Sequence, residues 1–229
     1  MCEQIKSKQR VADHGEVFTN EREVKAMCDL VGDEVKKISS TVLEPACGEG
    51  NFLIEILRRK LATVQELYGS EEEKYGLNSV IAVSSLYGVD ILGDNVVICR
   101  QNLFDLWQDT YVQVIGKGPE EKLRKTVMYI LEQNIVRGNT LSTKLVDENT
   151  NDTDEPIVFS EWIFDEQGFV TREEDRFDAM LEADEPDKQP DLFAWLQDPD
   201  EKWQKDPVTG KYLTIIHERV HYKEVGSND

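Results

Sequence analysis

The turn at residues 44–50, Glu-Pro-Ala-Cys-Gly-Glu-Gly, has residue types suited to holding a ligand. Gly48 and Gly50 can adopt backbone angles that other residues resist, and they let a ligand approach the main chain closely. A helix beginning after the turn would direct its N-terminal amides at a negative group such as a carboxylate. Glu44, directly before the turn, could accept hydrogen bonds from an ammonium group. We therefore expect a ligand site here, although a lone glycine turn is also common as a plain turn.

Asp90 is the second residue placed for chemistry, at the end of the apolar segment 80–91. An acidic residue at the end of a strand accepts hydrogen bonds from ribose hydroxyls in nucleotide-binding folds. The alternative is an exposed aspartate that only closes the strand. The separation from the turn exceeds the ~20 residues of the dinucleotide fingerprint. We interpret the polar residues 68–79 as a solvated insert that accounts for the difference.

The elements that must position these residues alternate between strand and helix. The apolar spacing predicts an entry helix within 15–38, with Thr19 or Asn20 as its N-cap. It then predicts strands at 41–44, 80–91 and 134–141 and helices at 51–67, 95–107 and 119–133. This alternation favours an α/β fold with a mostly parallel sheet and helices on both faces.

Four segments, in order, resemble the adenine-specific DNA methyltransferases of restriction–modification systems. VLEPACGEGNFLIEIL (42–57) is similar to their S-adenosylmethionine (SAM) binding motif, and HGEVFTNEREVKAMCDLV (14–31) to the segment that precedes it. LYGVDI (86–91) and NIVRGNTL (134–141) are similar to the second and third motifs. The resemblance covers about 130 residues. It implies a Rossmann-like, SAM-dependent methyltransferase fold for residues 1–145.

The resemblance also implies which residues bind SAM. Glu16, Phe18 and Thr19 would wrap the methionine end, Asp90 would bind the ribose, and Asn139 would meet the adenine amino group. The remaining expected contacts are Glu44, Pro45, Ala46, Cys47, Gly48, Gly50, Asn51, Phe52 and Ile91. Two positions depart from the family pattern: Asn20 replaces the usual Pro, and Asn139 replaces the common Asp. Both substitutions are compatible with binding, because an amide can also hydrogen-bond adenine.

The family's catalytic motif, [DNS]-P-P-[YFW], is missing. In the family its polar groups hold the target amino group and its ring stacks on the flipped base. No Pro-Pro dipeptide occurs in the sequence, and the Asp-Pro steps at 198–199 and 206–207 are poor substitutes. The catalytic residues therefore stay unassigned. We expect a DNA adenine methyltransferase-related protein of restriction–modification or mobile-element type, completed in trans by a catalytic and recognition subunit.

Two other functions remain open. The first is a catalytically inactive, SAM-binding regulatory or scaffold subunit, and the second is an acidic interaction protein that kept the fold but lost the cofactor. The net charge of −20 bears on partners, because residues 146–229 hold 24 acidic and 8 basic side chains. Such a segment repels the DNA backbone, whose binding depends on basic side chains. We expect an acidic, partly ordered extension over 146–229, a protein partner, and DNA contact only through that partner.

His217-Glu218-Arg219-Val220-His221 matches the H-E-x-x-H zinc signature. We interpret these histidines as ordinary packing or surface residues, because the surrounding residues alternate as in a strand, and we expect no metal. The four cysteines form no C-x-x-C pair and are expected to be free thiols. No run of 18 apolar residues and no apolar leader occurs, so we expect a cytoplasmic protein without a membrane span.

Overall fold

The structure is a computed structural model, and it describes residues 19–183, 203–206 and 211–227. The described chain forms an α/β domain with a five-stranded sheet and a second, four-stranded sheet. The helices are α2 (Glu21–Val31), α3 (Asn51–Tyr68), α4 (Glu72–Ser84), α5 (Gly93–Ile115), α6 (Glu121–Asn134) and α7 (Phe177–Ala183), with 3-10 turns η1 (Gly32–Lys36) and η3 (Tyr222–Glu224). The strands are β1 (Val42–Glu44), β2 (Leu86–Asp90), β3 (Ile135–Asn139), β4 (Lys144–Val146), β5 (Asp152–Pro156), β6 (Val158–Phe164), β7 (Phe169–Arg176), β8 (Ile215–Ile216) and β9 (Val220–His221).

The larger sheet has the strand order β1-β2-β3-β4-β5 and is mixed. β1, β2 and β3 run parallel, whereas β4 and β5 each pair antiparallel with the preceding strand. The sheet therefore differs from the mostly parallel sheet expected from the sequence. The reason is the connection after β3: residues 140–143 form a short turn, and a parallel pair would need a crossover of a dozen residues or more.

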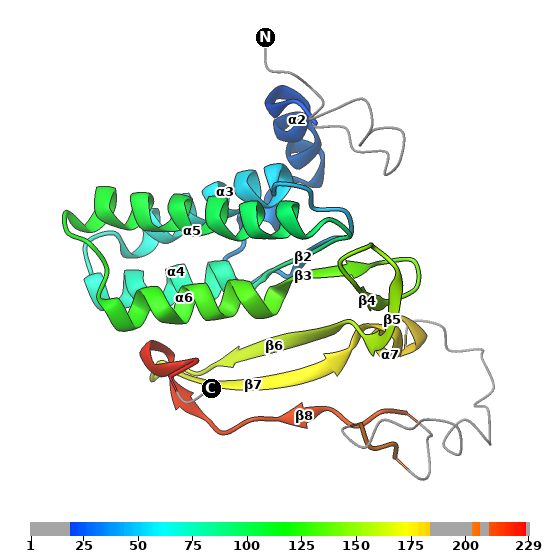
Figure 1. Cartoon of the computed structure of the whole chain (residues 1–229). Helices are drawn as coiled ribbons and strands as arrows, with labels where there is room; N and C mark the ends of the chain where they lie inside the picture. Colours follow the sequence, from blue (N-terminus) through cyan, green and yellow to red (C-terminus); the bar gives the residue numbers. More distant parts are fainter. Residues whose placement is uncertain (1–18, 184–202, 207–210, 228–229) are drawn as a thin grey trace.

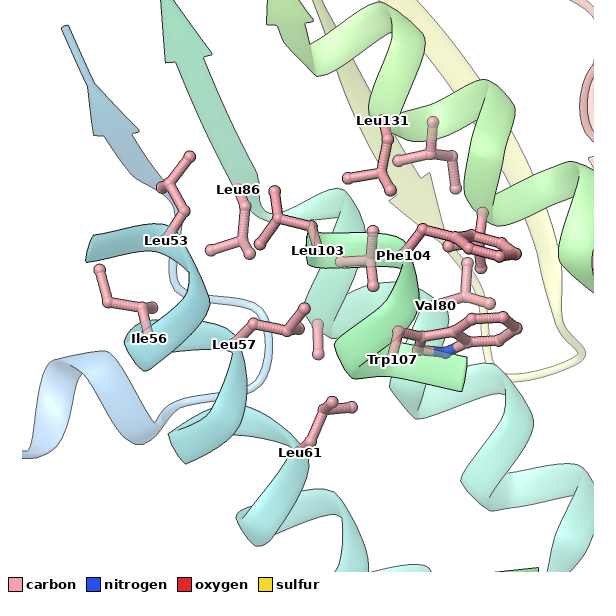
Figure 2. Close-up of a cluster of buried hydrophobic side chains, with 14 of the residues drawn as sticks. Leu53, Ile56, Leu57, Leu61, Val80, Leu86, Leu103, Phe104, Trp107 and Leu131 are labelled. Atoms are coloured by element: carbon pink, nitrogen blue, oxygen red, sulfur yellow. The ribbon is translucent and has the colours of Figure 1, made fainter. Parts of the chain in front are cut away.

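The elements stack in three layers (Figure 1). α3 and α5 form one outer layer. α4 and α6 form the middle layer. α4 leads into β2 and α6 leads into β3, so the larger sheet lies at the end of this helix pair. The second sheet, β6 to β9, forms the other outer layer. Aliphatic side chains of α3 meet Trp107 of α5 and Val80 of α4 at the centre of the core (Figure 2).

β2 is buried on both faces. Leu86 belongs to the core shared with the helices, whereas Tyr87 and Val89 pack against Phe159 and Phe177. The Tyr87 hydroxyl also donates a 2.7 Å hydrogen bond to the carbonyl of Ser160. One face of the sheet is therefore covered by helices, and the other by β6 and α7. The chain passes residue 145 inside β4, and later residues complete both cores.

Most of the predicted elements are confirmed, including the helices after the glycine turn and before β3. The strand predicted over 80–91 is shorter: β2 covers Leu86–Asp90, because the apolar residues up to Ser84 belong to the buried end of α4. The prediction of a solvated insert over 68–79 is wrong, because α4 occupies most of it and buries Tyr75 and Ser79 completely. Acidic residues in the first turn of α4 give the segment its polar appearance, while the later turns pack into the core. Trp107 fixes this packing, because its indole Nε1 donates to the Ser79 hydroxyl at 3.0 Å.

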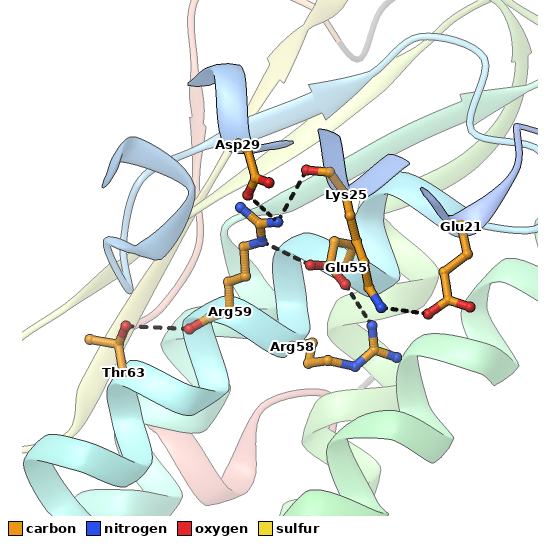
Figure 3. Close-up of polar contacts among 7 residues, drawn as sticks. All are labelled: Glu21, Lys25, Asp29, Glu55, Arg58, Arg59 and Thr63. Atoms are coloured by element: carbon orange, nitrogen blue, oxygen red, sulfur yellow. Dashed lines mark hydrogen bonds and ion pairs between the residues drawn. The ribbon is translucent and has the colours of Figure 1, made fainter. Parts of the chain in front are cut away.

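The entry helix α2 is held against α3. Asn20 is its N-cap, and the Asn20 side chain accepts a hydrogen bond from the Arg22 amide. Val24 and Cys28 are buried beneath the helix. A polar network also joins the two helices, centred on Arg59 of α3 (Figure 3). Its guanidinium meets Asp29 at 2.9 Å, Glu55 at 2.8 Å and the Lys25 carbonyl at 3.2 Å.

The two edges of the larger sheet differ. β5, at one edge, carries Asp152, Asp154, Glu155 and Pro156. Acidic side chains and proline on an edge strand prevent further strands from pairing there. β1, at the other edge, is Val-Leu-Glu and pairs only with β2 among the described strands. Its Leu43 side chain is 37% exposed.

Candidate functional site

The turn between β1 and α3 is built by backbone hydrogen bonds. The Cys47 amide donates to the Val89 carbonyl at 2.9 Å, and the Gly50 amide donates to the Cys47 carbonyl at 2.8 Å. Both Gly48 and Gly50 have left-handed backbone angles, with φ of 53° and 92°. The turn therefore lies at the carboxyl ends of β1 and β2, where ligands bind in open α/β folds.

The two glycines have different surroundings. A Cβ on Gly50 would lie 2.7 Å from the Cys99 sulfur, so Gly50 lets the turn pack closely on α5. A Cβ on Gly48 would meet no atom of the described residues within 4 Å. The space above Gly48 is therefore open, and a ligand can approach the main chain there.

Asp90 joins the turn to the start of α5. Its Oδ2 accepts a 2.9 Å hydrogen bond from the Gly48 amide. Its Oδ1 accepts hydrogen bonds from the Leu92 amide at 2.8 Å and from the Asn95 side chain at 3.3 Å. Asp90 thus fixes the conformation of the turn and does more than close a strand. A carboxylate has about four lone-pair positions, so Asp90 can also accept from a ligand hydroxyl.

Glu44 is half-buried at the end of β1. Burial raises the pKa of its carboxyl group, and a hydrogen bond with the Ala46 backbone acts in the opposite direction. Pro45 and Ala46, which follow it, are exposed. The exposed start of the turn and the half-buried carboxylate form the side of the site next to β1.

Cys47 has a packing role in the turn. It is buried, and its thiol is in hydrogen-bonding contact with the buried Cys99 thiol. This contact and burial both raise the pKa of the Cys47 thiol far above its usual range. The thiolate is the reactive form of cysteine, so Cys47 is inert at neutral pH. This agrees with the expectation of a free thiol for the three described cysteines.

Asn139 and Thr140 lie at the end of β3. The Asn139 side chain donates to Asp152 at 2.9 Å and accepts from the Leu141 amide at 3.1 Å. The Thr140 hydroxyl donates to the Pro45 carbonyl at 2.6 Å, across the end of β2. The structure therefore brings Thr140 to the turn and directs Asn139 towards β5.

The remaining predicted residues lie around the same edge. The Thr19 carbonyl accepts a 3.4 Å hydrogen bond from the Asn51 side chain, which places the start of α2 beside the turn. Phe52 packs against the helical core, and the Ile91 carbonyl accepts from Arg137 at 3.3 Å. The predicted contacts Glu16 and Phe18 lie outside the described residues.

Sequence reasoning missed the residues that support the turn from α5 and β3. Besides Asn95 and Thr140, Asn102 donates to the Glu49 carbonyl at 3.0 Å. Cys99 supplies the surface on which Gly50 packs. Asn95, Cys99 and Asn102 recur at helical spacing after Asp90, on one face of α5. This spacing was the one signal that could have identified them.

A cavity of about 230 Å³ lies away from this edge, between α6 and the second sheet. Arg172 lines it, but its guanidinium donates to Ser160 at 2.9 Å and to Gln133 at 3.0 Å and also contacts Tyr129 and Glu174. These partners use the donors of Arg172 within the protein. The cavity is therefore a less developed ligand site than the turn.

The H-E-x-x-H segment does not form a helix. His217 follows β8 and donates its amide to the Arg172 carbonyl at 2.9 Å, and His221 in β9 pairs with Phe169. The two imidazoles therefore do not share a helical face as the zinc signature requires. Over the described ranges, no three His, Cys, Asp or Glu side chains are grouped so that they could hold a metal ion.

The site at the turn combines amides, an open glycine surface and two carboxylates, which suits a ligand with an ammonium group and hydroxyl groups. Comparisons of the chain with protein-family models, with curated proteins and with solved structures find no match. Among the helices that the structure describes, none is both long and apolar enough to cross a bilayer.

Proposed function

We propose that this chain is the SAM-binding part of a DNA adenine methyltransferase of restriction–modification or mobile-element type. The observation that carries the proposal is the bond from the Gly48 amide to Asp90, which joins a strand–glycine turn–helix unit to an acidic residue on the next strand. The four sequence segments that resemble the family add the identity of the ligand. The mixed α/β sheet is compatible with the proposed Rossmann-like methyltransferase fold.

The residues at the turn fit the proposed cofactor. The open space at Gly48 admits a ligand against the backbone, and Asp90 keeps acceptor positions for ribose hydroxyls. Glu44 is placed for the ammonium group of the methionine end. SAM supplies an electrophilic methyl group, and these residues would hold the cofactor in a fixed orientation. In methyl transfer of this kind, orientation of the two reactants provides much of the rate enhancement.

The proposal assigns the target base to a second polypeptide. The sequence has no Pro-Pro-aromatic motif to hold a flipped adenine. Its net charge of −20 also opposes direct binding to the phosphate backbone. A partner subunit with a basic surface and the catalytic motif would supply both functions, and DNA would bind to the complex.

A regulatory or scaffold subunit that binds SAM without catalysis is the second candidate, and the missing motif favours it. The two candidates share the cofactor site but differ in whether a partner restores methyl transfer to DNA. A reconstitution assay with labelled SAM therefore separates them.

The first test is calorimetric titration of the full chain with SAM. We expect binding in the micromolar range, and at least tenfold weaker binding by Asp90→Ala. Asp109→Ala, an exposed carboxylate further along α5, is the control and should bind as the unmodified chain does. Absence of binding up to millimolar SAM by the folded protein would refute the cofactor assignment.

A further inference from the structure

Thr140 contacts the cofactor turn from the far side of β2. The larger sheet has the order β1-β2-β3, so β1 and β3 lie roughly 10 Å apart with β2 between them. The Thr140 hydroxyl, directly after β3, nevertheless donates to the Pro45 carbonyl, directly after β1, at 2.6 Å. This hydrogen bond therefore crosses the carboxyl end of β2 and joins the third strand to the start of the turn.

The peptide group between Pro45 and Ala46 accepts this bond and also donates one. Its carbonyl belongs to Pro45 and its amide to Ala46. A hydrogen bond with the Ala46 backbone lowers the pKa of the Glu44 carboxyl group, so the Ala46 amide donates to the Glu44 carboxylate. Because a peptide group is planar and rigid, its carbonyl and its amide turn together. A single rigid group therefore joins Thr140 on one side to Glu44 on the other.

The bond from Thr140 affects the Glu44 carboxylate in two ways. The proline ring already fixes the φ angle of Pro45, and the bond to its carbonyl restrains the remaining rotation, so the Ala46 amide keeps its direction towards Glu44. Hydrogen bonds in a chain also polarise one another, which makes the Ala46 amide a stronger donor. Glu44 is half-buried, and burial favours its neutral form. Thr140 therefore helps to keep the Glu44 carboxylate charged and oriented.

We propose that Thr140 is a positioning residue for Glu44, and that through Glu44 it strengthens binding of the ammonium group at the methionine end of the ligand. The identity of the ligand rests on the proposed function, whereas the hydrogen-bonded path from Thr140 to Glu44 does not. Asp90 has the corresponding role for the ribose, and it contacts the turn at the Gly48 amide. Different strands therefore hold the two ends of the ligand: β2 the ribose, and β1 with β3 the amino-acid end.

Amide hydrogen exchange of the full, isotope-labelled chain tests the path without any ligand. Thr140→Val keeps the shape of the side chain but removes the hydroxyl, and we expect the Ala46 amide to exchange about fivefold faster in it. Thr140→Ser, which keeps the hydroxyl, should recover the slower rate. Thr153→Val is the matched control, because the Thr153 hydroxyl also donates to a carbonyl, that of Leu145, at 3.0 Å on the distant strand β5. An Ala46 amide that exchanges equally fast in Thr140→Val and in the unmodified chain would overturn the proposal.

Two ligands separate the two ends of the site in calorimetric titrations. The first is S-adenosylhomocysteine, and the second is its deamino analogue, in which hydrogen replaces the amino group. We expect Thr140→Val to weaken binding of the first about fivefold and of the second by less than about twofold. Thr153→Val should bind both as the unmodified chain does, and Asp90→Ala should weaken both to the same extent. Equal weakening of the two ligands by Thr140→Val would overturn the role of Thr140 at the ammonium group.

Glu44→Gln completes a double-mutant cycle with Thr140→Val. If Thr140 acts through Glu44, Thr140→Val should add little to the loss of S-adenosylhomocysteine binding that Glu44→Gln already causes. Additive losses would show that Thr140 acts by another route, and they would overturn the proposal while leaving the SAM assignment intact. Thr140→Ala removes the same hydroxyl and replaces Thr140→Val if that variant does not fold. Failure of the folded, unmodified chain to bind either ligand would refute the SAM assignment, and the role at the ammonium group with it.

Discussion

Gly48→Ala and Gly116→Ala form a matched pair that tests the cofactor site. Both glycines have left-handed backbone angles, with φ of 53° and 81°, and at both an added Cβ meets no atom within 4 Å in the part of the chain that the structure describes. Gly48 lies in the turn, whereas Gly116 ends α5, whose start is next to Asp90. The 23 residues of α5 separate the two positions by roughly 35 Å along the helix. The variants therefore share the backbone change and differ in location.

The structure gives the expected magnitudes. A left-handed conformation costs a residue with a Cβ about 1–2 kcal/mol, so each variant should be less stable by about that amount. For a chain of this size the melting temperature should fall by about 2–8 °C. Only Gly48→Ala places a methyl group where SAM is proposed to contact the main chain. Overpacking of this kind costs about 1–3 kcal/mol, which weakens binding by between fivefold and a hundredfold.

Thermal unfolding and calorimetric titration with SAM measure the two effects separately. We expect similar melting temperatures for the two variants and weaker SAM binding for Gly48→Ala alone. Unchanged affinity in a folded Gly48→Ala protein would refute the placement of SAM against the turn. Equal weakening in both variants would show that binding follows stability, and the local argument would fail.

Three further predictions concern stability, each measured by chemical denaturation. Gly50→Ala should lower the free energy of unfolding by about 2–4 kcal/mol, because the new Cβ meets the Cys99 sulfur at 2.7 Å. Adding Cys99→Ala to the same chain should recover part of this loss. Asn134→Ala should lower the free energy of unfolding by about 3 kcal/mol or more. The buried Asn134 side chain donates to the Ser84 and Leu86 carbonyls and accepts from Trp162, so its removal leaves these groups unpaired. An unchanged free energy of unfolding would contradict this reasoning. Burial lowers the pKa of Lys60 to about 8, below its unfolded value, so Lys60 itself contributes a rise in unfolding free energy between pH 8 and about 9.5, opposed by the buried thiols of Cys28 and Cys47, whose pKa values are raised by burial and contacts. Lys60→Met keeps the thiols, so the difference in unfolding free energy between the unmodified chain and the variant should change by about 1–2 kcal/mol over this window in favour of the unmodified chain. A difference that does not change with pH would exclude Lys60 as the source.

The local geometry of the site could be predicted from the sequence. Leu53 and Leu57 repeat at helical spacing after the glycines, so the strand–turn–helix unit follows from neighbouring residues. Asp90 also falls where the sequence places it, at the end of the second strand of the sheet. Such features depend on short-range periodicity and on the conformations that glycine permits.

The contacts between distant segments could not be predicted in the same way. The bond from Thr140 to Pro45 and the pairing of Asn139 with Asp152 depend on how β3 turns back into β4 and β5. Apolar residues alternate in β6, as is typical of a strand, but this pattern does not indicate that Phe159 covers Tyr87 of β2. In α4, the acidic first turn concealed Tyr75, whose burial depends on the aromatic neighbour Tyr111 in α5. These arrangements require the tertiary fold.

The acidic β5 edge has a consequence for association between copies of the chain. Asp152, Asp154 and Glu155 lie close together on β5, so two such edges would bring like charges together if they met. Pro156 also lacks the amide that a neighbouring strand would need. Growth of the larger sheet across β5 is therefore disfavoured, and self-association through this edge should be weak even at high protein concentration.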